Sequence, residues 1–313
     1  MPVYNSELYV YEAIQSILVQ TFSDFELLIF NDGSTDTSEK IILSITDKRI
    51  SYFKNESNLG IIETRNLGLS QARGNYIAMM DSDDISISTR LEHQFQLMEN
   101  NPSIGVCGAI IEFIGNRQGS FGYNENPVST FTKLMTAPPF GQSTAFIRKS
   151  VLDKYSLKYN YDYPHAEDYK FWLDISKHSD IYCLPDTLVY YRWHTLNDSN
   201  VYQKMQQQSS RKVQKEWFEI VLNRRINKRE SKYFEGNVTF SSCLYYNLLC
   251  FSVLKDPQIP VDSKHVIEQR TRVNRFVLNS ISNRVIKKML FPLLLLDKLI
   301  SKMVMRHILN GRI

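Results

Sequence analysis

The sequence lacks the cysteine and histidine patterns that hold a disulfide framework or a zinc ion. Its 313 residues include four cysteines and six histidines, with no CxxC pair and no histidine pair at zinc-ligand spacing. Isolated reduced thiols are typical of a cytoplasmic chain, so we expect that location. Disulfide-rich secreted scaffolds and zinc modules are disfavoured.

Glycine-rich phosphate loops are missing as well. The sequence contains no GxGxxG fingerprint and no glycine-rich basic loop near its start, which disfavours a dinucleotide oxidoreductase and a nucleotidyltransferase. Its first residues do not show the basic start and apolar run of a signal peptide. The apolar stretch MLFPLLLL near the end is much shorter than the roughly 20 residues that cross a bilayer. We therefore expect no integral membrane segment.

Charge is divided unevenly along the chain. Residues 1–202 hold 16 Lys and Arg against 25 Asp and Glu, whereas residues 203–313 hold 21 against 8. The net charges of −9 and +13 predict two units with different partners, a catalytic domain over 1–202 and a basic helical region over 203–313.

Near the end of the basic region, cationic residues alternate with leucines and methionines. These residues are Lys287, Lys288, Lys298, Lys302 and Arg306. Such a pattern favours an amphipathic helix on an anionic membrane surface. It is equally compatible with a helical subdomain that packs on the catalytic domain or on a second subunit. No nucleic-acid-binding motif is present, so we expect no nucleic acid partner.

The first hundred residues alternate between short apolar runs and helical patterns. The runs FELLIF (25–30), ISYF (50–53) and YIAMM (76–80) predict buried strands. Helices are predicted over 7–20 with Ser6 as cap, over 36–45 with Asp36 and Glu39 as capping box, and over 61–72, 90–100 and 166–177. This alternation predicts an α/β fold with a mostly parallel open sheet flanked by helices.

Acidic turns follow two of these strands. Asn31-Asp32 comes after the first run and the segment 81–84, DSDD, comes after the third. Ligands of open α/β sheets bind beside the carboxyl ends of the strands, so these carboxylates are candidates for one crevice. Clustered carboxylates repel each other, and Mg²⁺ or Mn²⁺ relieves that repulsion. The alternative is a solvated acidic turn that caps the following helix.

Five ordered segments resemble one enzyme family. They are PVYN at the start, QTFSDFELLIFNDGSTD (20–36), NLGIIETRNLGL (58–69), ARGNYIAMMDSDD (72–84) and AEDYKFW (166–172). Their order and spacing resemble the inverting family 2 glycosyltransferases with the GT-A fold, bacterial enzymes that build capsule, lipopolysaccharide or exopolysaccharide. The resemblance covers about residues 1–200. It implies sugar transfer from a nucleotide-diphosphate donor, which we expect to be UDP-linked, to a saccharide or lipid-linked saccharide at the inner face of the cytoplasmic membrane.

The resemblance also implies a nucleotide site. Pro2, Val3 and Tyr4 match the loop that packs on the nucleotide base, and Asp32 matches the carboxylate that binds the base edge. Arg65 matches a basic residue near the nucleotide. In the family a central strand precedes this loop. Because little chain precedes the loop here, we expect that strand to be short, to cost stability and to loosen the loop.

The segment 81–84 matches the family's DxD motif. The resemblance implies that Asp81 contacts ribose, that Asp83 holds Mn²⁺ or Mg²⁺ against the diphosphate, and that Asp84 supports the turn. His194 matches a histidine that approaches metal or diphosphate in some members, although its aromatic neighbours equally explain it as a packed side chain.

The pair Glu167-Asp168 matches the family's general base. The resemblance assigns Asp168 that role, with Glu167 as the alternative or as support. A carboxylate at a helix start is stabilised in its ionised form by the helix dipole, which suits a base. Read alone, both are ordinary first-turn acids. A non-catalytic scaffold that docks partners through the basic region is the competing hypothesis, and the retained acidic motifs argue against it.

Overall fold

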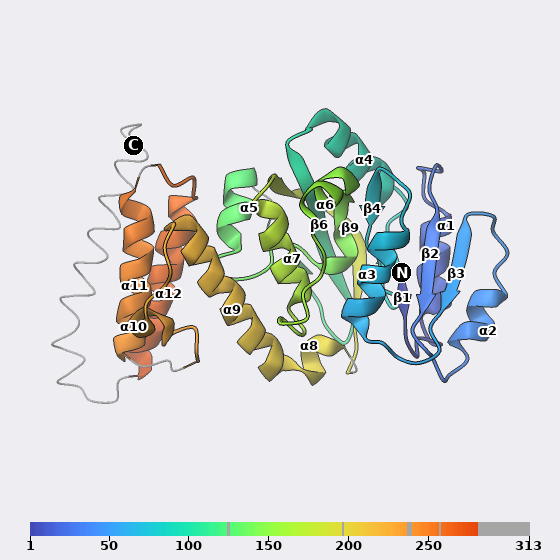
Figure 1. Ribbon diagram of the computed structural model, residues 1–313. Coiled ribbons are helices and arrows are strands. Elements are labelled where there is room, and N and C mark those ends of the chain that lie inside the picture. Colours follow the sequence, from blue (N-terminus) through green and yellow to red (C-terminus); the bar gives the residue numbers. More distant parts are fainter. Residues whose placement is uncertain (124–125, 196, 237–239, 257, 281–313) are drawn as a thin grey trace. The chain divides into compact units, whose positions relative to one another are not determined.

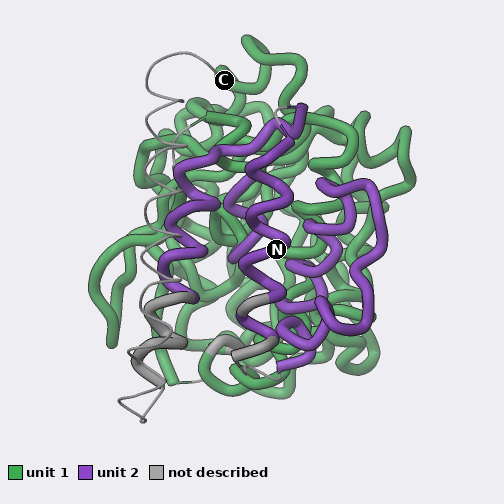
Figure 2. The backbone as a smooth tube through the Cα atoms, turned by 90° about the vertical axis from the view of Figure 1, so that its left-hand side faces the viewer, with its two compact units in different colours: residues 1–131, 138–209 green, residues 132–137, 210–313 purple. Residues whose placement is uncertain are grey.

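The computed structural model describes residues 1–123, 126–195, 197–236, 240–256 and 258–280. They form two compact units, coloured separately in Figure 2. Unit 1 is Met1–Phe131 with Pro138–Ser209, and unit 2 is Thr132–Ala137 with the chain from Ser210 on. The domain division at residues 202 and 203 stays a prediction. The cationic residues between 287 and 306 lie outside the described residues.

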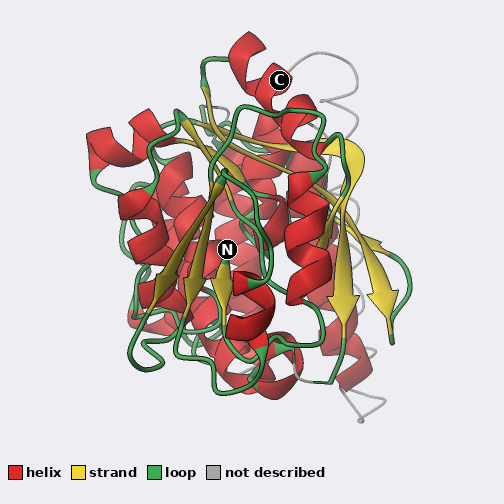
Figure 3. Ribbon diagram, turned by 90° about the vertical axis from the view of Figure 1, so that its right-hand side faces the viewer, coloured by secondary structure: helices red, strands yellow, loops and turns green. Residues whose placement is uncertain are grey.

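The described residues of unit 1 form two sheets (Figures 1 and 3). The first sheet has the order β1-β2-β3 and consists of β1 (Pro2–Val3), β2 (Leu27–Asn31) and β3 (Ile50–Lys54). The second has the order β4-β8-β6-β9-β5, with β7 beside β6. Its strands are β4 (Tyr76–Ala78), β5 (Ile85–Ser86), β6 (Ile104–Gly115), β7 (Ser120–Phe121), β8 (Phe146–Arg148) and β9 (Asp180–Trp193).

Helices cover these sheets. In unit 1 they are α1 (Val10–Leu18), α2 (Ser38–Leu43), α3 (Ile61–Gln71), α4 (Arg90–Asn100), α6 (Lys149–Tyr155), α7 (Glu167–Ser176) and α8 (Asp198–Val201), with the 3-10 turn η1 (Gln142–Thr144). The α/β class with an open parallel sheet is confirmed by β1, β2 and β3, which pair in parallel.

The strand pairing changes from parallel to antiparallel at the third apolar run, 76–80. The predicted strand over 76–80 exists as β4, but it pairs antiparallel with β8, at Ile77 opposite Ile147. In the same sheet β6 and β9 form a long parallel pair from Ile104 to Trp193. The second sheet is therefore mixed, because β8 enters between β4 and β6 from a segment about seventy residues further along.

Two expectations about helix starts were wrong. Helix α1 begins at Val10, because the Ser6 hydroxyl lies 2.7 Å from Ser82 Oγ and makes no cap. Helix α2 begins at Ser38 without the expected capping box. The Glu39 carboxylate accepts hydrogen bonds from Lys54 Nζ at 2.7 Å and from Tyr52 at 3.1 Å instead. Both side chains thus make tertiary contacts in place of local ones.

Arg90, the first residue of α4, holds the end of β4. Its side chain is fully buried and donates to the carbonyl oxygens of Met79 at 2.7 Å and Ala145 at 3.3 Å, and to Gln94 Oε1 at 3.0 Å. Burial lowers its pKa to about 10. The cation therefore fixes the backbone immediately before the segment 81–84.

Unit 2 is helical, as expected for the basic region. Its helices are α10 (Lys228–Ser231), α11 (Phe240–Lys255) and α12 (Ser263–Ser280), and α5 (Pro127–Lys133) and α9 (Gln203–Val221) enter it from unit 1. Phe218 packs against Trp217, Phe234 and Tyr246 in its core. Among the described residues, no helix has the length and apolar character needed to cross a bilayer.

Candidate active site

The acidic turn 81–84 lies between β4 and β5 and is held by a serine from η1. Ser143 Oγ lies 3.0 Å from Asp81 Oδ2 and 2.5 Å from Asp84 Oδ2. Burial and the negative charges of Asp83 and Asp81 raise the pKa of Asp84 well above its usual range. Since one hydroxyl has one hydrogen, the two carboxyl groups share the serine. Asp84 thus supports the turn from inside the protein.

Asp83 and His194, which the resemblance assigns to metal binding, lie side by side. The distance between Asp83 Oδ2 and His194 Nε2 is 3.0 Å. The His194 ring stacks on Tyr9 with centroids 5.3 Å apart, and the Arg192 guanidinium lies 4.8 Å from the centroid of the same tyrosine. Arg192 also donates through Nε to the Asp83 carbonyl oxygen at 3.0 Å and forms an ion pair with Glu12.

Arg65 of α3 connects the acidic turn to the start of α7. Its Nη2 lies 2.9 Å from Asp81 Oδ1 and its Nη1 lies 2.6 Å from Glu167 Oε1. The guanidinium is buried, and the two carboxylates hold its pKa above the usual range against the opposing effect of burial. This bridge places Asp81 and Glu167 on either side of a single cation.

Asp168 occupies the first turn of α7 beside Glu167. Burial, followed by the negative charge of Glu167, raises the pKa of Asp168 to about 7, although Arg65 and the hydrogen bond from Tyr169 N at 2.7 Å act in the opposite direction. The helix dipole therefore does not hold this carboxylate ionised as expected, because desolvation outweighs it. A carboxyl group with this pKa can accept a proton near neutral pH.

Among the described residues, four buried polar atoms on or beside the residues of these contacts have no hydrogen-bond partner. They are Thr64 Oγ1, Arg65 Nε, Gln142 Oε1 and Glu167 Oε2. Gln142 is linked to this group by Tyr159. Its Nε2 donates a hydrogen bond to the Tyr159 hydroxyl at 2.7 Å. Unsatisfied buried polar atoms are rare in native proteins and mark sites that take a polar ligand or water.

Asp32 organises the loop before α3. Its Oδ1 accepts hydrogen bonds from Asn55 Nδ2 and from Leu59 N, both at 2.8 Å, and its Oδ2 accepts one from Gly60 N at 2.9 Å. Gly60 adopts a left-handed φ of 88°. The buried carboxylate is thus placed at the carboxyl end of β2, where the sequence placed it, and the loop 55–60 wraps around it.

The first residues lie differently from the predicted base-binding loop. Pro2 and Val3 form β1 itself, and Val3 is buried in the core between the sheet and α1. Tyr4 is 47% exposed at the carboxyl end of that strand. Only Tyr4 of the three therefore presents its side chain to solvent, because the strand occupies the positions expected in the loop.

The residues of this site would supply only part of the ligand set of a divalent cation. Among the described residues no group of three or more His, Cys, Asp or Glu side chains could hold a metal ion. Asp83 and His194 supply one hard oxygen and one imidazole nitrogen 3.0 Å apart. Mg²⁺ and Mn²⁺ accept such oxygen and nitrogen ligands, and Mg²⁺ in particular is held by one or two protein carboxylates while substrate phosphates and water complete its coordination. The residues present agree with that arrangement.

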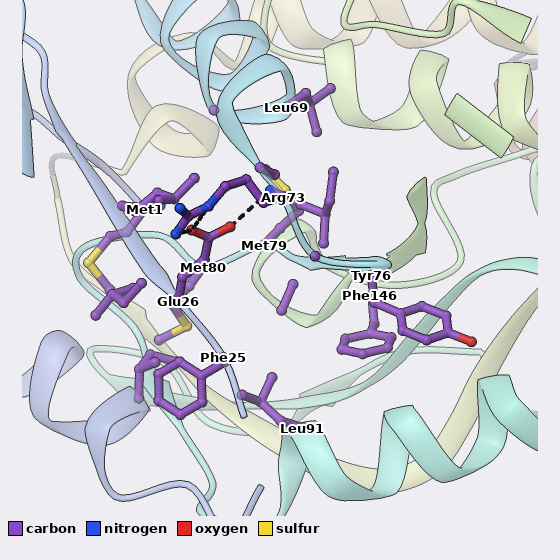
Figure 4. Close-up of a pocket in the computed structure, with 18 of the residues that line it drawn as sticks. Met1, Phe25, Glu26, Leu69, Arg73, Tyr76, Met79, Met80, Leu91 and Phe146 are labelled. Carbon is purple, nitrogen blue, oxygen red and sulfur yellow. Dashed lines mark hydrogen bonds and ion pairs between the residues drawn. The ribbon is translucent and has the colours of Figure 1, made fainter. Parts of the chain in front are cut away.

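A cavity of about 600 Å³ lies between β2 and β4 (Figure 4). Apolar side chains of β2, α3, β4 and α4 line it, and the Glu26–Arg73 pair lies at one side. Met1 enters it, donating from its amino group to the Leu28 carbonyl oxygen at 2.8 Å, and burial lowers the pKa of this amine to about 5. None of the carboxylates of 81–84 lines the cavity, but Thr64 and Arg65 do, so the cavity adjoins the polar site without containing its carboxylates.

Sequence reasoning missed several residues of this site. Ser143, Tyr9 and Ser6 contact the acidic turn or His194 but belong to no recognisable motif. Arg192 carried a weak signal, since it stands two positions before His194 in the run YYRWH. These contacts join segments far apart in the chain, which no local pattern encodes.

Comparison with known proteins agrees with this architecture. The profile of Glycosyl transferase family 2 matches residues 1–156. The chain is 34% identical to the UDP-Glc:alpha-D-GlcNAc-diphosphoundecaprenol beta-1,3-glucosyltransferase WfgD of Escherichia coli over 181 aligned residues. The alignment covers 58% of this chain and 70% of WfgD.

Solved structures share the fold at low identity. TarS 1–349 of S. aureus in complex with UDP-GlcNAc superposes with a TM-score of 0.60 at 18% identity, covering 90% of this chain and 91% of TarS. The mannosyltransferase PcManGT of Pyrobaculum calidifontis in complex with GDP-Man and Mn²⁺ gives a TM-score of 0.54 at 12% identity, covering 97% and 82%. The fold of this chain is therefore GT-A.

The chain belongs to glycosyltransferase family 2. It is accordingly a glycosyltransferase with a GT-A catalytic fold, and family membership favours an enzyme over a scaffold.

Proposed function

We propose that this chain transfers a sugar from a UDP-sugar to a saccharide or lipid-linked saccharide acceptor, with inversion at the anomeric carbon and with Mn²⁺ or Mg²⁺. The observation that carries the proposal is the Arg65 bridge, which joins Asp81 of the acidic turn to Glu167 next to Asp168. The donor class is supported by WfgD, named for a UDP-Glc donor, and by TarS, solved with UDP-GlcNAc.

In this proposal Asp168 is the general base. It removes the proton from the acceptor hydroxyl while the acceptor oxygen forms a bond to the anomeric carbon. The bond between that carbon and the diphosphate oxygen breaks at the same time, and its electron pair leaves with UDP. Attack from the face opposite the leaving group inverts the configuration. A base with a pKa of about 7 suits proton removal near neutral pH, a contribution of roughly 10²- to 10⁴-fold.

The remaining site residues bind and orient the donor. Asp81 binds ribose, Asp32 and Tyr4 bind the base, and Asp83 with His194 holds the cation. A bound Mn²⁺ or Mg²⁺ supplies neutralisation of the charge that grows on the leaving diphosphate. The unsatisfied atoms of Thr64, Gln142 and Glu167 support a hydroxyl-rich ligand in the same place.

We further propose that the enzyme works at the inner face of the cytoplasmic membrane in cell-surface polysaccharide synthesis. The lipid-linked acceptor in the name of WfgD and the net charge of +13 over residues 203–313 support peripheral contact with anionic lipid. The proposal includes no nucleic acid partner and allows self-association through unit 2.

Thermal unfolding in the presence of nucleotides tests the donor site. The expected result is stabilisation by UDP with Mn²⁺, absent with GDP, dTDP and CDP, and lost in Asp83→Asn. A ligand at 100 times its dissociation constant adds about 2.7 kcal/mol to the unfolding free energy. Asp153→Asn is the matched control, since this aspartate is exposed and paired with Lys149. Asp168→Asn should keep the UDP response and lose sugar transfer.

Contrary outcomes are equally clear. If none of the four nucleotides stabilises the protein, the proposed donor site is overturned. If Asp83→Asn is stabilised by UDP with Mn²⁺ as much as the wild type, the proposed cation site is overturned. Retained configuration in the product, read from the anomeric proton coupling in NMR, would overturn the inverting step.

A further inference from the structure

Two aromatic side chains from distant segments stack on each other, and one of them stands three positions before the proposed base. The rings of His165 and Tyr202 have centroids 4.1 Å apart and an interplanar angle of 14°. His165 stands three positions before Asp168, and Tyr202 connects α8 to α9. The stack therefore brings the segment after β9 to the start of α7, both within unit 1.

The backbone at His165 is unusual for this residue type. His165 adopts a left-handed φ of 60°, directly before Ala166, whose N–H donates to the Tyr163 carbonyl oxygen at 3.1 Å. Side chains other than glycine rarely take this conformation, and such strain is concentrated at functional sites. The turn thus holds the imidazole where the Tyr202 ring covers one of its faces.

The tyrosine of the pair remains largely open to solvent. Tyr202 is 43% exposed, and the neighbouring Val201 and Met205 are 53% and 44% exposed. Val201, Tyr202 and Met205 give the junction between α8 and α9 an exposed apolar surface. The Tyr202 ring stacks on His165, which stands three positions before Asp168.

We propose that His165 and Tyr202 form the acceptor side of the active site, where the exposed ring of Tyr202 packs against the apolar face of a pyranose ring. This inference rests on the proposed function, because it takes Asp168 as the base. A pyranoside presents C–H groups on one face and hydroxyl groups at its edge. The aromatic ring packs on the C–H groups, and the Asp168 carboxylate receives a proton from a hydroxyl group.

The role of the His165 ring is to hold Tyr202 in place. Without the imidazole, the tyrosine loses the surface that covers one of its faces, and its side chain gains rotamer freedom. Aromatic contacts of this kind change affinity by about 2- to 10-fold. The expected loss on removing either ring is of that size, and it should affect acceptor binding without affecting UDP binding.

Saturation-transfer NMR tests the proposal with defined probes. Methyl β-D-glucopyranoside, methyl β-D-galactopyranoside and methyl N-acetyl-β-D-glucosaminide are added separately to the whole chain with UDP and Mn²⁺. At least one should give saturation transfer, falling about 3- to 10-fold in Tyr202→Ala and in His165→Asn. Asparagine tolerates the left-handed backbone, so the second variant removes the ring and keeps the turn.

Three further variants distinguish the loss of an aromatic ring from the loss of folded structure. Tyr202→Phe keeps the aromatic face and should keep the signal. Tyr11→Ala, which removes a 56% exposed tyrosine from α1, should leave it unchanged. His165→Gly relieves the backbone strain and should lose the signal without loss of thermal stability. All variants should retain the stabilisation by UDP, so failure of the donor site is detected separately.

The proposal is overturned by an equal glycoside signal in Tyr202→Ala, or by no signal from any of the three glycosides with the wild-type chain. It is also overturned if Tyr202→Ala weakens binding to phosphatidylglycerol vesicles while the glycoside signal persists. That result would assign the apolar surface to lipid.

Discussion

Arg65 and Glu167 form a buried ion pair with 2.6 Å between Nη1 and Oε1, although 102 positions separate them in the chain. The same guanidinium contacts Asp81, so a single cation compensates carboxylates from two sides of the site. Removing it leaves the buried Glu167 carboxylate and the partly exposed Asp81 carboxylate without their counter-charge.

Replacement of Arg65 should therefore destabilise the protein strongly. Arg65→Met is expected to lower the free energy of unfolding by about 3–5 kcal/mol, because buried charges lose their partner. Urea denaturation measures the change. The matched control is Arg73→Met, which breaks an ion pair between Glu26 and an arginine that is 80% exposed, and should cost less than about 1 kcal/mol. Equal losses in the two variants would contradict the structural role of the bridge.

Activity should rise with pH through the titration of Asp168. The pKa of about 7 predicts that kcat/KM increases tenfold per pH unit below that value and levels off above it. Since the negative charge of Glu167 contributes to the raised pKa, Glu167→Gln should shift this acidic limb to lower pH. The pH profile of UDP release measures both. An unchanged limb in Glu167→Gln would show that another group is titrating.

The same carboxyl group should make stability depend on pH. Its folded pKa of about 7 lies above the unfolded value, so the folded state binds the extra proton. The resulting stability is complete below about pH 4 and decreases as the pH rises from about 4 to 7, by up to roughly 4 kcal/mol. Asp168→Asn should flatten this slope in urea denaturation at pH 5, 6 and 7. A slope equal to that of the wild type would assign the linkage elsewhere.

Tyr9 should affect the requirement for Mn²⁺ rather than turnover. Its ring stacks on His194, which lies 3.0 Å from Asp83 Oδ2, so Tyr9→Ala frees the imidazole to rotate. The Mn²⁺ concentration for half-maximal activity is expected to increase about 10-fold or more, with a smaller change in kcat at saturating Mn²⁺. Tyr11→Ala on the same helix is the control. Identical Mn²⁺ titrations in both variants would exclude a positioning role.

Two glycines flanking Asp32 should respond differently to alanine. Gly33 and Gly60 both have left-handed φ angles, of 71° and 88°. A Cβ on Gly33 would lie 2.7 Å from the backbone carbon of Ser57, whereas one on Gly60 would have nothing within 4 Å. Gly60→Ala should cost about 1 kcal/mol of backbone strain, and Gly33→Ala clearly more because of the clash. Thermal unfolding compares them, and the reverse order would contradict the packing of this loop.

Elements with a continuous local signal were predictable from sequence. The helices α3 and α4 and the strands β2 and β3 lie within about two residues of the predicted ranges, because apolar spacing and flanking turn residues define them. Ser6 and Glu39 were misassigned because their polar side chains can make either local or tertiary hydrogen bonds. The sequence shows only the local option. The antiparallel pairing of β4 depended on a strand seventy residues away.

The candidate site was predictable only where it consists of acidic motifs. Asp32, Asp83 and Asp168 stand at strand ends or at a helix start, positions that the sequence pattern identifies. The metal-binding roles of Asp83 and His194 came from resemblance and remain predictions, whereas their proximity is a finding of the structure. The shared Ser143 and the stack of His165 on Tyr202 arise from chain segments that meet only in the folded protein.

The cavity between β2 and β4 bears on how copies of this protein interact. Among the described residues, β4 pairs with β8 alone, and β2 pairs with β1 only at Phe30 and Asn31 on the side toward the cavity. Strand edges with available N–H and C=O groups are templates for intermolecular pairing. Aggregation on heating should therefore begin at this cleft, with one molecule donating an extended segment to the next.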